Sequence, residues 1–240
     1  MKLFPGCTVT SRLPFVESAT RYIAENLGVD ISGTERMCCF EPTGLRSMDP
    51  GMWAAVGKEI HSRNESEDLV TLCEGCNISL TLSKGKIGND GRTAEVNGLL
   101  EFLHDNIEEI KKRASVPVEG TFAVFPGCHG EYAYGTRGHD ASAMMSEILE
   151  AVGCSSNTIK GPVCCGGGLQ GVHDDIATEI LQGAVDRFKE EGSGIAAVSC
   201  VFCFRRLDIA AKFPVMHISE IVARAMGWDA DVSRYHRTKV

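Results

Sequence analysis

The 240-residue chain has no long hydrophobic run, no excess of positive charge and no block of basic residues. Its strongly apolar stretches fall far short of the ~20 residues that a membrane-spanning helix needs, and its first residues do not resemble a secretory signal peptide. A net charge of -8 argues against nucleic acids and anionic membranes as partners. We therefore expect a cytoplasmic protein without a membrane span.

The chain also lacks a flavin-binding motif and the cysteine spacing of cubane ferredoxins, so it has no evident electron source of its own. The glycine run at Gly166–Gly171, GGGLQG, formally matches the dinucleotide-binding fingerprint. That fingerprint belongs between a strand and a helix N-terminus, whereas this run follows two cysteines. We expect the glycines to bring backbone N–H groups close to sulfur ligands instead.

Cysteine is abundant, with 11 residues. Disulfides are rare in the cytosol, so this load predicts metal or redox chemistry. Ten of the cysteines form two sets with the same order, a lone cysteine, an adjacent pair and a C-x-x-C motif: Cys7, Cys38, Cys39, Cys73 and Cys76, then Cys128, Cys164, Cys165, Cys200 and Cys203. This repeat predicts a duplicated fold. Cys154 lies outside both sets, and we expect it to be a small buried apolar residue.

The surroundings of the cysteines repeat as well. The tetrapeptide FPGC occurs at residues 4–7 and 125–128, each time after a short apolar run that predicts a strand. Helical periodicity follows at 14–28 and 141–153. Buried strands of the parallel type are expected at 68–72 and 194–199, and each of these strands leads into a C-x-x-C motif.

The rest of the chain completes the expected architecture. Residues 95–114 predict one long helix between the halves, and residues 213–228 predict a strand and a helix. We expect an α/β fold of two pseudo-repeated subdomains, 1–117 and 118–240, each with a small, mainly parallel sheet. Cluster sites should lie on loops at the strand ends, where open α/β sheets bind ligands.

Five cysteines in each half exceed the needs of one metal ion. Zinc takes four ligands, and two adjacent cysteines such as Cys38 and Cys39 tend to point apart, which a polynuclear site accommodates. The spacing therefore favours one iron–sulfur cluster per half over zinc, although it does not define the type of cluster. A zinc-binding structural subunit remains an alternative.

The pattern resembles the CCG-domain cysteine-rich family, in particular the B subunits of heterodisulfide reductase from methanogenic archaea. The similar segments are FPGC followed by SRLP, MCCFEPTG, TLCEGCNISL, FPGCHGEY, VCCGGG and SCVFCFRRLD. The resemblance implies two noncubane 4Fe-4S clusters, each held by the five cysteines of one set. One departure is Phe40, which stands where the second CCG motif has glycine, so the shape of this loop is in question.

The activity implied by the resemblance is reduction of the small disulfide that joins coenzyme M and coenzyme B, which carries sulfonate, carboxylate and phosphate groups. In an acidic protein such anions need local positive charge, so Arg12, Arg205 and Arg206 are candidate substrate-binding residues. His129, directly after a cysteine, is a candidate catalytic proton donor. Ordinary surface or structural roles for these four residues remain alternatives.

The resemblance also implies partner proteins. These are a ferredoxin-like iron–sulfur subunit of the C type and a flavin-containing, electron-bifurcating subunit of the A type, and it leaves open whether a hydrogenase or formate dehydrogenase is attached. Related CCG subunits serve lactate or glycolate oxidation, fumarate reduction and sulfur oxidation. An electron-relay subunit of such a complex is therefore a second alternative.

Overall fold

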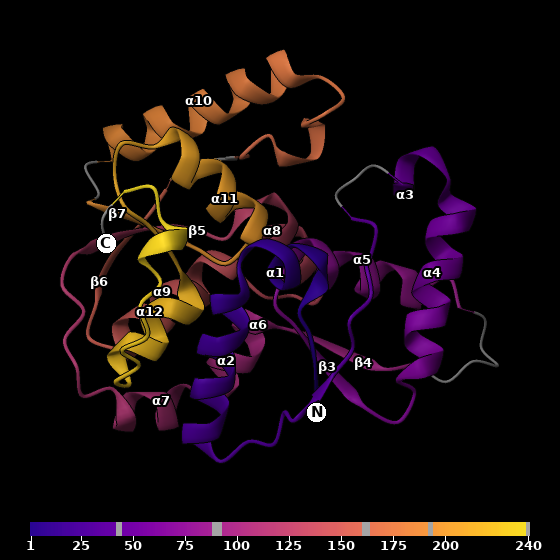
Figure 1. The fold of residues 1–240 in the computed structure, drawn as a ribbon, viewed down its shortest axis with the longest axis horizontal. Helices are drawn as coiled ribbons and strands as arrows, with labels where there is room; N and C mark the ends of the chain where they lie inside the picture. Colours follow the sequence, from indigo (N-terminus) through magenta and orange to yellow (C-terminus); the bar gives the residue numbers. More distant parts are fainter. Residues whose placement is uncertain (42–44, 88–92, 160–163, 192–193, 239–240) are drawn as a thin grey trace.

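The computed structural model describes residues 1–41, 45–87, 93–159, 164–191 and 194–238, and Figure 1 shows their arrangement. It contains two four-stranded sheets in which all paired strands are parallel. The first sheet has the order β2-β1-β3-β4 and consists of β1 (Lys2–Phe4), β2 (Gly33–Thr34), β3 (Asp68–Thr71) and β4 (Glu95–Gly98). The second has the order β6-β5-β7-β8 and consists of β5 (Thr121–Phe125), β6 (Ser155–Thr158), β7 (Ile195–Val198) and β8 (Val215–His217). The predicted α/β fold with two similar halves is confirmed.

Helices follow the strands in the same succession in both halves. The first half contains α1 (Gly6–Arg12), α2 (Pro14–Leu27), α3 (Leu45–Met48), α4 (Pro50–Arg63), α5 (Glu74–Lys84), α6 (Leu99–Asp105) and α7 (Ile107–Arg113). The second contains α8 (Gly127–Gly135), α9 (Ala141–Ala151), α10 (Asp174–Glu190), α11 (Val201–Ala210) and α12 (Ile218–Ala225). Within the described ranges, none of these helices combines the length and the apolar character that crossing a membrane requires.

The prediction of one long helix over residues 95–114 is wrong. Residues Glu95–Gly98 form the edge strand β4, in which Val96 is buried between an exposed and a half-exposed neighbour, the alternation expected of a strand. Gly98 then caps helix α6, and its N–H donates to the Glu101 carboxylate at 2.8 Å. At Asn106 the helix is interrupted, and the side-chain amide of this residue donates to the Phe102 carbonyl at 2.8 Å.

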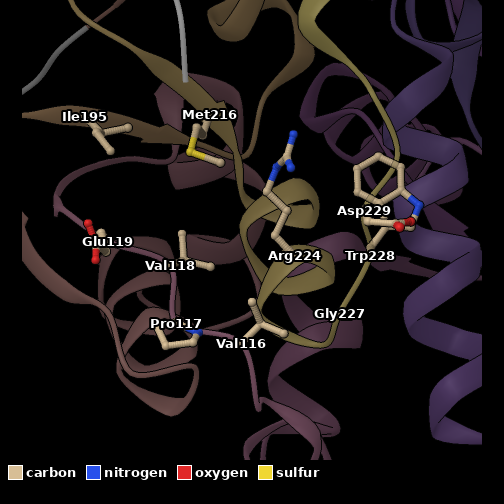
Figure 2. Close-up of a pocket in the computed structure, with 10 residues that line it drawn as sticks. All are labelled: Val116, Pro117, Val118, Glu119, Ile195, Met216, Arg224, Gly227, Trp228 and Asp229. Atoms are coloured by element: carbon tan, nitrogen blue, oxygen red, sulfur yellow. The ribbon is translucent and has the colours of Figure 1, made fainter.

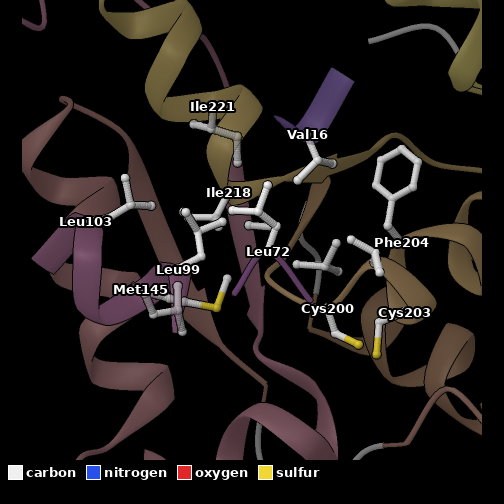
Figure 3. Close-up of a cluster of buried hydrophobic side chains, with 14 of the residues drawn as sticks. Val16, Leu72, Leu99, Leu103, Met145, Cys200, Cys203, Phe204, Ile218 and Ile221 are labelled. Carbon is white, nitrogen blue, oxygen red and sulfur yellow. The ribbon is translucent and has the colours of Figure 1, made fainter. Parts of the chain in front are cut away.

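Helices of the two halves pack against each other. Helix α2 packs against α12, and the corresponding helix of the second half, α9, packs against α6. Figure 3 shows the side chains where these helices meet, among them Val16, Leu99, Leu103, Met145, Ile218 and Ile221. The Tyr22 hydroxyl also donates to the Met226 carbonyl at 3.1 Å across the same boundary. The two halves therefore share one core, and the division into subdomains at residue 117 stays a prediction.

Candidate functional site

The cysteines of both sets gather where strands of the two sheets end. Cys7 and Cys128 lie in the first turns of α1 and α8, directly after β1 and β5. Cys73 and Cys200 occupy the N-cap positions of α5 and α11, directly after β3 and β7. The remaining cysteines lie in the first turns of the same two helices or in the segments after β2 and β6: Cys76, Cys203, Cys38, Cys39, Cys164 and Cys165. Both parallel sheets thus present sulfur at their carboxyl edge, where such sheets bind ligands.

In the first half the sulfur atoms meet in pairs. The Sγ atoms of Cys38 and Cys7 lie 3.7 Å apart, and those of Cys39 and Cys76 lie 2.9 Å apart. The two adjacent cysteines therefore face different partners, as expected for a polynuclear site. Among the residues that the structure describes, no three His, Cys, Asp or Glu side chains are arranged to hold a single metal ion.

The second half repeats this pairing. The Sγ atoms of Cys128 and Cys164 lie 3.8 Å apart, and those of Cys203 and Cys165 lie 3.3 Å apart. The two members of the adjacent pair again face different partners. The cysteine set in each half thus consists of two pairs of thiols plus the cysteine that caps the next helix.

The capping cysteines bring the two sets together. Cys73 and Cys200 are both buried, and they lie close enough across the boundary between the halves for each side chain to shift the pKa of the other. Hydrogen bonds from Cys200 and Cys76 lower the pKa of Cys73 to about 6. The ten cysteines therefore form one continuous group rather than two isolated sets.

The exposed ends of the two sets also contain thiols that ionise easily. The hydrogen bond from Cys38 lowers the pKa of Cys7 to about 6, and the hydrogen bond from Cys128 lowers the pKa of Cys164 to about 6. The thiolate is the form of cysteine that binds metals. The same hydrogen bonds raise the pKa of the partner thiols, Cys38 and Cys128, so one thiol of each pair ionises near neutral pH while the other keeps its proton. The ionised thiols are soft anionic donors of the kind that holds iron–sulfur clusters.

The glycine of each FPGC motif is required by the cysteines around it. Gly6 and Gly127 have φ angles of +73° and +77°, in the left-handed region that favours glycine. A Cβ at Gly6 would lie 2.6 Å from the Sγ of Cys76, and one at Gly127 would lie 2.8 Å from the Sγ of Cys203. The repeated motif thus lets the backbone approach a sulfur ligand candidate in both halves.

The backbone at Phe40 has the same conformation as the backbone at its counterpart, Gly166. Phe40 has φ +56° and its N–H donates to the Sγ of Cys38 at 3.4 Å, while Gly166 has φ +69° and donates to the Sγ of Cys164 at 3.3 Å. A Cβ at Gly166 would collide with the carbonyl of Ala177 on α10. Phe40 is 39% exposed, so its side chain has room. The departure from the motif therefore leaves the backbone conformation at this position unchanged.

His129 lies between the two halves. Its Nδ1 is 3.8 Å from the Sγ of Cys128, and its Nε2 is 3.7 Å from a carboxylate oxygen of Glu41, whose other oxygen lies 3.3 Å from Arg46. Burial lowers the pKa of His129, but the Glu41 carboxylate and the negative charge of nearby thiolates outweigh it, so the net shift is upward. Geometrically, His129 can hold a proton next to the cysteine group.

The three candidate substrate-binding arginines divide into two groups. Arg12 and Arg205 line one cavity of about 390 Å³. Arg206 instead donates from Nε to the Cys165 carbonyl at 3.1 Å and from Nη2 to the Ala177 carbonyl at 2.8 Å. Its contacts therefore tie the loop of the adjacent cysteines to α10.

A larger cavity, of about 530 Å³, lies at the opposite end of the second sheet (Figure 2). Its lining includes Ile195 at the start of β7, Val118 from the segment before β5, and Trp228, whose indole lies 6.0 Å from the Arg224 guanidinium. None of the described residues that line it is a cysteine. The size of a cavity therefore does not locate the chemistry in this protein.

A buried polar network beside the cysteines escaped the sequence analysis. Glu74, within the first C-x-x-C motif, accepts a hydrogen bond from the Tyr134 hydroxyl at 3.1 Å, and Arg137 donates to the Glu101 carboxylate at 2.7 Å. Burial raises the pKa of Glu74 to about 7, with the charge of Cys200 adding to the effect. The only signal in the sequence was the charged residue between two predicted ligands. The network links α5 to α8 across the two halves.

Comparison with known proteins agrees with this architecture. The cysteine-rich domain family, CCG, matches residues 1–81 and 122–208. This match covers more than half of the chain and both cysteine sets, so the protein belongs to the CCG family. The resemblance expected from the cysteine motifs is confirmed.

Curated relatives span nearly the whole chain. The B subunit of the ferredoxin/F(420)H(2)-dependent CoB-CoM heterodisulfide reductase of Methanosarcina acetivorans is 27% identical, over 96% of this chain and 90% of the relative. The B subunit of the ferredoxin:CoB-CoM heterodisulfide reductase of Methanosarcina mazei has the same identity and coverage. The membrane anchor subunit of the 8-methylmenaquinol:fumarate reductase of Wolinella succinogenes is 24% identical, over 93% of this chain and 91% of the relative. Together these similarities support an iron–sulfur subunit with a redox role in an oxidoreductase complex.

Proposed function

We propose that this protein is the catalytic subunit of a heterodisulfide reductase, which reduces the disulfide of coenzyme M and coenzyme B to two thiols. The observation that carries the proposal is the repetition of the same two sulfur pairs in both five-cysteine sets, at the carboxyl edges of two equivalent parallel sheets. Reduction of a disulfide consumes two electrons and two protons. Two adjacent redox centres match the number of electrons.

Each set of five cysteines is proposed to hold one noncubane 4Fe-4S cluster. When bound, the clusters would supply the two electrons that breaking the S–S bond requires. The chain supplies soft thiolate donors in pairs, the close backbone approach at Gly6 and Gly127, and backbone N–H groups that donate to Cys38 and Cys164. The residues present therefore fit such a group.

His129 is proposed to deliver a proton to one departing thiolate. Its Nδ1 faces Cys128, and Glu41 beside Nε2 favours the protonated ring. Arg12, Arg205 and Arg206 are proposed to attract the anionic groups of the disulfide, with the cavity that contains Arg12 and Arg205 as the better-supported site. Replacing His129 by Gln should slow turnover at neutral pH while leaving the iron content intact.

The electrons must come from partner proteins, because the sequence carries no flavin or cubane-cluster motif of its own. We propose a ferredoxin-like subunit of the C type as the direct donor and a flavin-containing, electron-bifurcating subunit of the A type beyond it. The proposal includes a hydrogenase or a formate dehydrogenase as the enzyme that delivers electrons to the flavin-containing subunit. Co-purification of the native complex under anaerobic conditions tests these partners.

The similarity to a fumarate reductase subunit favours a second candidate, an electron-relay subunit that passes electrons to the enzyme of another substrate. Turnover decides between the two. Anaerobically purified protein, reduced with a viologen dye, should convert the heterodisulfide to coenzyme M and coenzyme B, and coenzyme M should alter the electron paramagnetic resonance signal of the oxidised protein. If the protein contains both clusters but neither converts the heterodisulfide nor changes its signal with coenzyme M, the electron-relay function is supported instead. Zinc in place of iron, without acid-labile sulfide, would refute both redox functions.

A further inference from the structure

The cavity of about 390 Å³ that Arg12 and Arg205 line contains two further arginines that sequence analysis did not single out. It lies between the end of α1, the outer face of α11 and the C-terminal segment, and four arginines line it: Arg12, Arg205, Arg234 and Arg237. We refer to it as the arginine cavity. Its one acidic residue is Asp208, which is buried and accepts hydrogen bonds from the backbone N–H of Arg237 at 3.0 Å.

The arginines of this cavity differ from others in the chain. Across the described ranges, none of the four guanidinium groups forms a salt bridge with a carboxylate, although the protein carries a net charge of -8. Arginines elsewhere, such as Arg63 with Glu59 at 2.9 Å and Arg137 with Glu101 at 2.7 Å, are paired. Arg234 contacts the ring and the hydroxyl of Tyr235, but this contact brings no negative charge. Four cations that no described carboxylate neutralises in a salt bridge repel one another unless an anion enters the cavity.

The C-terminal segment is fixed at the cavity rather than loosely attached. The ring of Tyr235 lies 5.4 Å from that of Phe15, and the ring of His236 lies 5.3 Å from that of Phe204. His236 is also 3.1 Å from the buried carboxylate of Glu220 on α12. Arg234 and Arg237 flank these two anchored residues, so the fold holds their backbone at the cavity.

We propose that the arginine cavity binds the phosphate group of the anionic disulfide, and that Arg234 and Arg237 are specificity-determining residues for it; this inference rests on the proposed function. The cavity contains four guanidinium groups and one carboxylate, so its charge matches a phosphate better than a singly charged sulfonate or carboxylate. A phosphate carries close to two negative charges and has three acceptor oxygens. Guanidinium groups also fit phosphate through paired hydrogen bonds.

Two helices connect the cavity to the cysteine group. Arg12 follows Cys7 by five residues on α1, which places its backbone about 8 Å further along the helix axis at 1.5 Å per residue. Arg205 follows Cys203 by two residues on α11. The same two helices thus carry both cysteines and cavity arginines, and the proposal requires the disulfide to extend past the helix surface from the exposed sulfurs to the cavity.

The test compares two double variants that remove the same charge. Arg234→Gln with Arg237→Gln changes the cavity, and Arg63→Gln with Arg113→Gln changes exposed, ion-paired arginines on α4 and α7. Binding of inorganic phosphate to the cluster-loaded protein is measured by isothermal titration calorimetry at low salt. Since each charge-assisted contact is worth about a factor of ten, we expect the cavity variant to bind phosphate at least tenfold more weakly. The control variant should bind like the wild type.

Turnover provides a second readout. The cavity variant should show a raised KM for the heterodisulfide with kcat preserved, and Arg234→Lys with Arg237→Lys should restore part of the affinity for phosphate. Equal phosphate binding by the cavity and control variants would overturn the inference, whether or not the protein reduces the disulfide. A third outcome is that the protein reduces no disulfide but still binds phosphate through Arg234 and Arg237. This result would refute the proposed function and the identity of the ligand, while the anion site itself would stand.

Discussion

Replacement of Gly6 by Ala tests whether the FPGC motif exists to let the backbone approach a ligand sulfur. The added Cβ would lie 2.6 Å from the Sγ of Cys76, where ordinary van der Waals contact begins at 3.4 Å. The sulfur must therefore retreat by about 0.8 Å, whereas metal sites hold their ligand distances to within about 0.2 Å. We expect Gly6→Ala to lose the first of the two centres, and with it half of the iron and acid-labile sulfide.

Gly28 provides a matched control, because it has the same φ angle of +73° but no atom within 4 Å of an added Cβ. Gly28→Ala should cost only the strain of the left-handed backbone, about 1 kcal/mol, or about 2–4 °C in Tm for a chain of this size. Its iron content should equal that of the wild type. Equal iron content in Gly6→Ala and Gly28→Ala, measured by metal and sulfide analysis, would refute the reasoning.

Three further predictions concern the loops and the core. Phe40→Gly should leave the iron content unchanged, because glycine adopts the same backbone conformation without strain, whereas Gly166→Ala, whose Cβ would strike the backbone of α10, should lower it; equal metal content in both variants would contradict this explanation. Burial lowers the pKa of the fully buried His217 from 6.5 to about 4. The folded protein therefore favours the neutral ring, and the resulting contribution to the free energy of unfolding is fully present above pH 6.5 and is lost as the pH falls through 4. The loss amounts to about 3 kcal/mol, and urea unfolding between pH 7 and pH 4 should show a weaker pH dependence in His217→Asn than in the wild type. Cys154→Ala should keep all of the iron and destabilise the fold by about 1 kcal/mol, since the thiol is buried and its sulfur lies 3.6 Å from the Val118 carbonyl; loss of iron would show that Cys154 is a ligand after all.

Much of the fold follows from local patterns in the sequence. The helix at α2 begins at a proline and ends at Gly28 in the left-handed conformation, and both features are readable from residue type. The strands before Cys73 and Cys200 are buried apolar runs that the sequence marks clearly. Because each strand must end before a helix begins, the placement of the cysteines at the sheet edges followed as well.

Other features depend on contacts between distant segments. Local sequence favours helix at β4 because Val96 is the only large apolar side chain on the buried face of this strand, and pairing with β3 decides the conformation. The contact of Cys73 with Cys200 and the role of Glu74 could not be predicted, since both depend on how the two halves pack. The same holds for Arg234, whose place in a cavity depends on where the C-terminal segment folds back.

The packing of helices from one half against helices from the other has a consequence for fragments of this protein. Helix α12 shields α2 and α6 shields α9, so a fragment ending near residue 117 would leave the apolar side of α2 in contact with water. A solitary half would need another surface to cover that side of α2. A second copy of the same half would offer one, because α6 and α12 follow the last strand of their sheets in the same way.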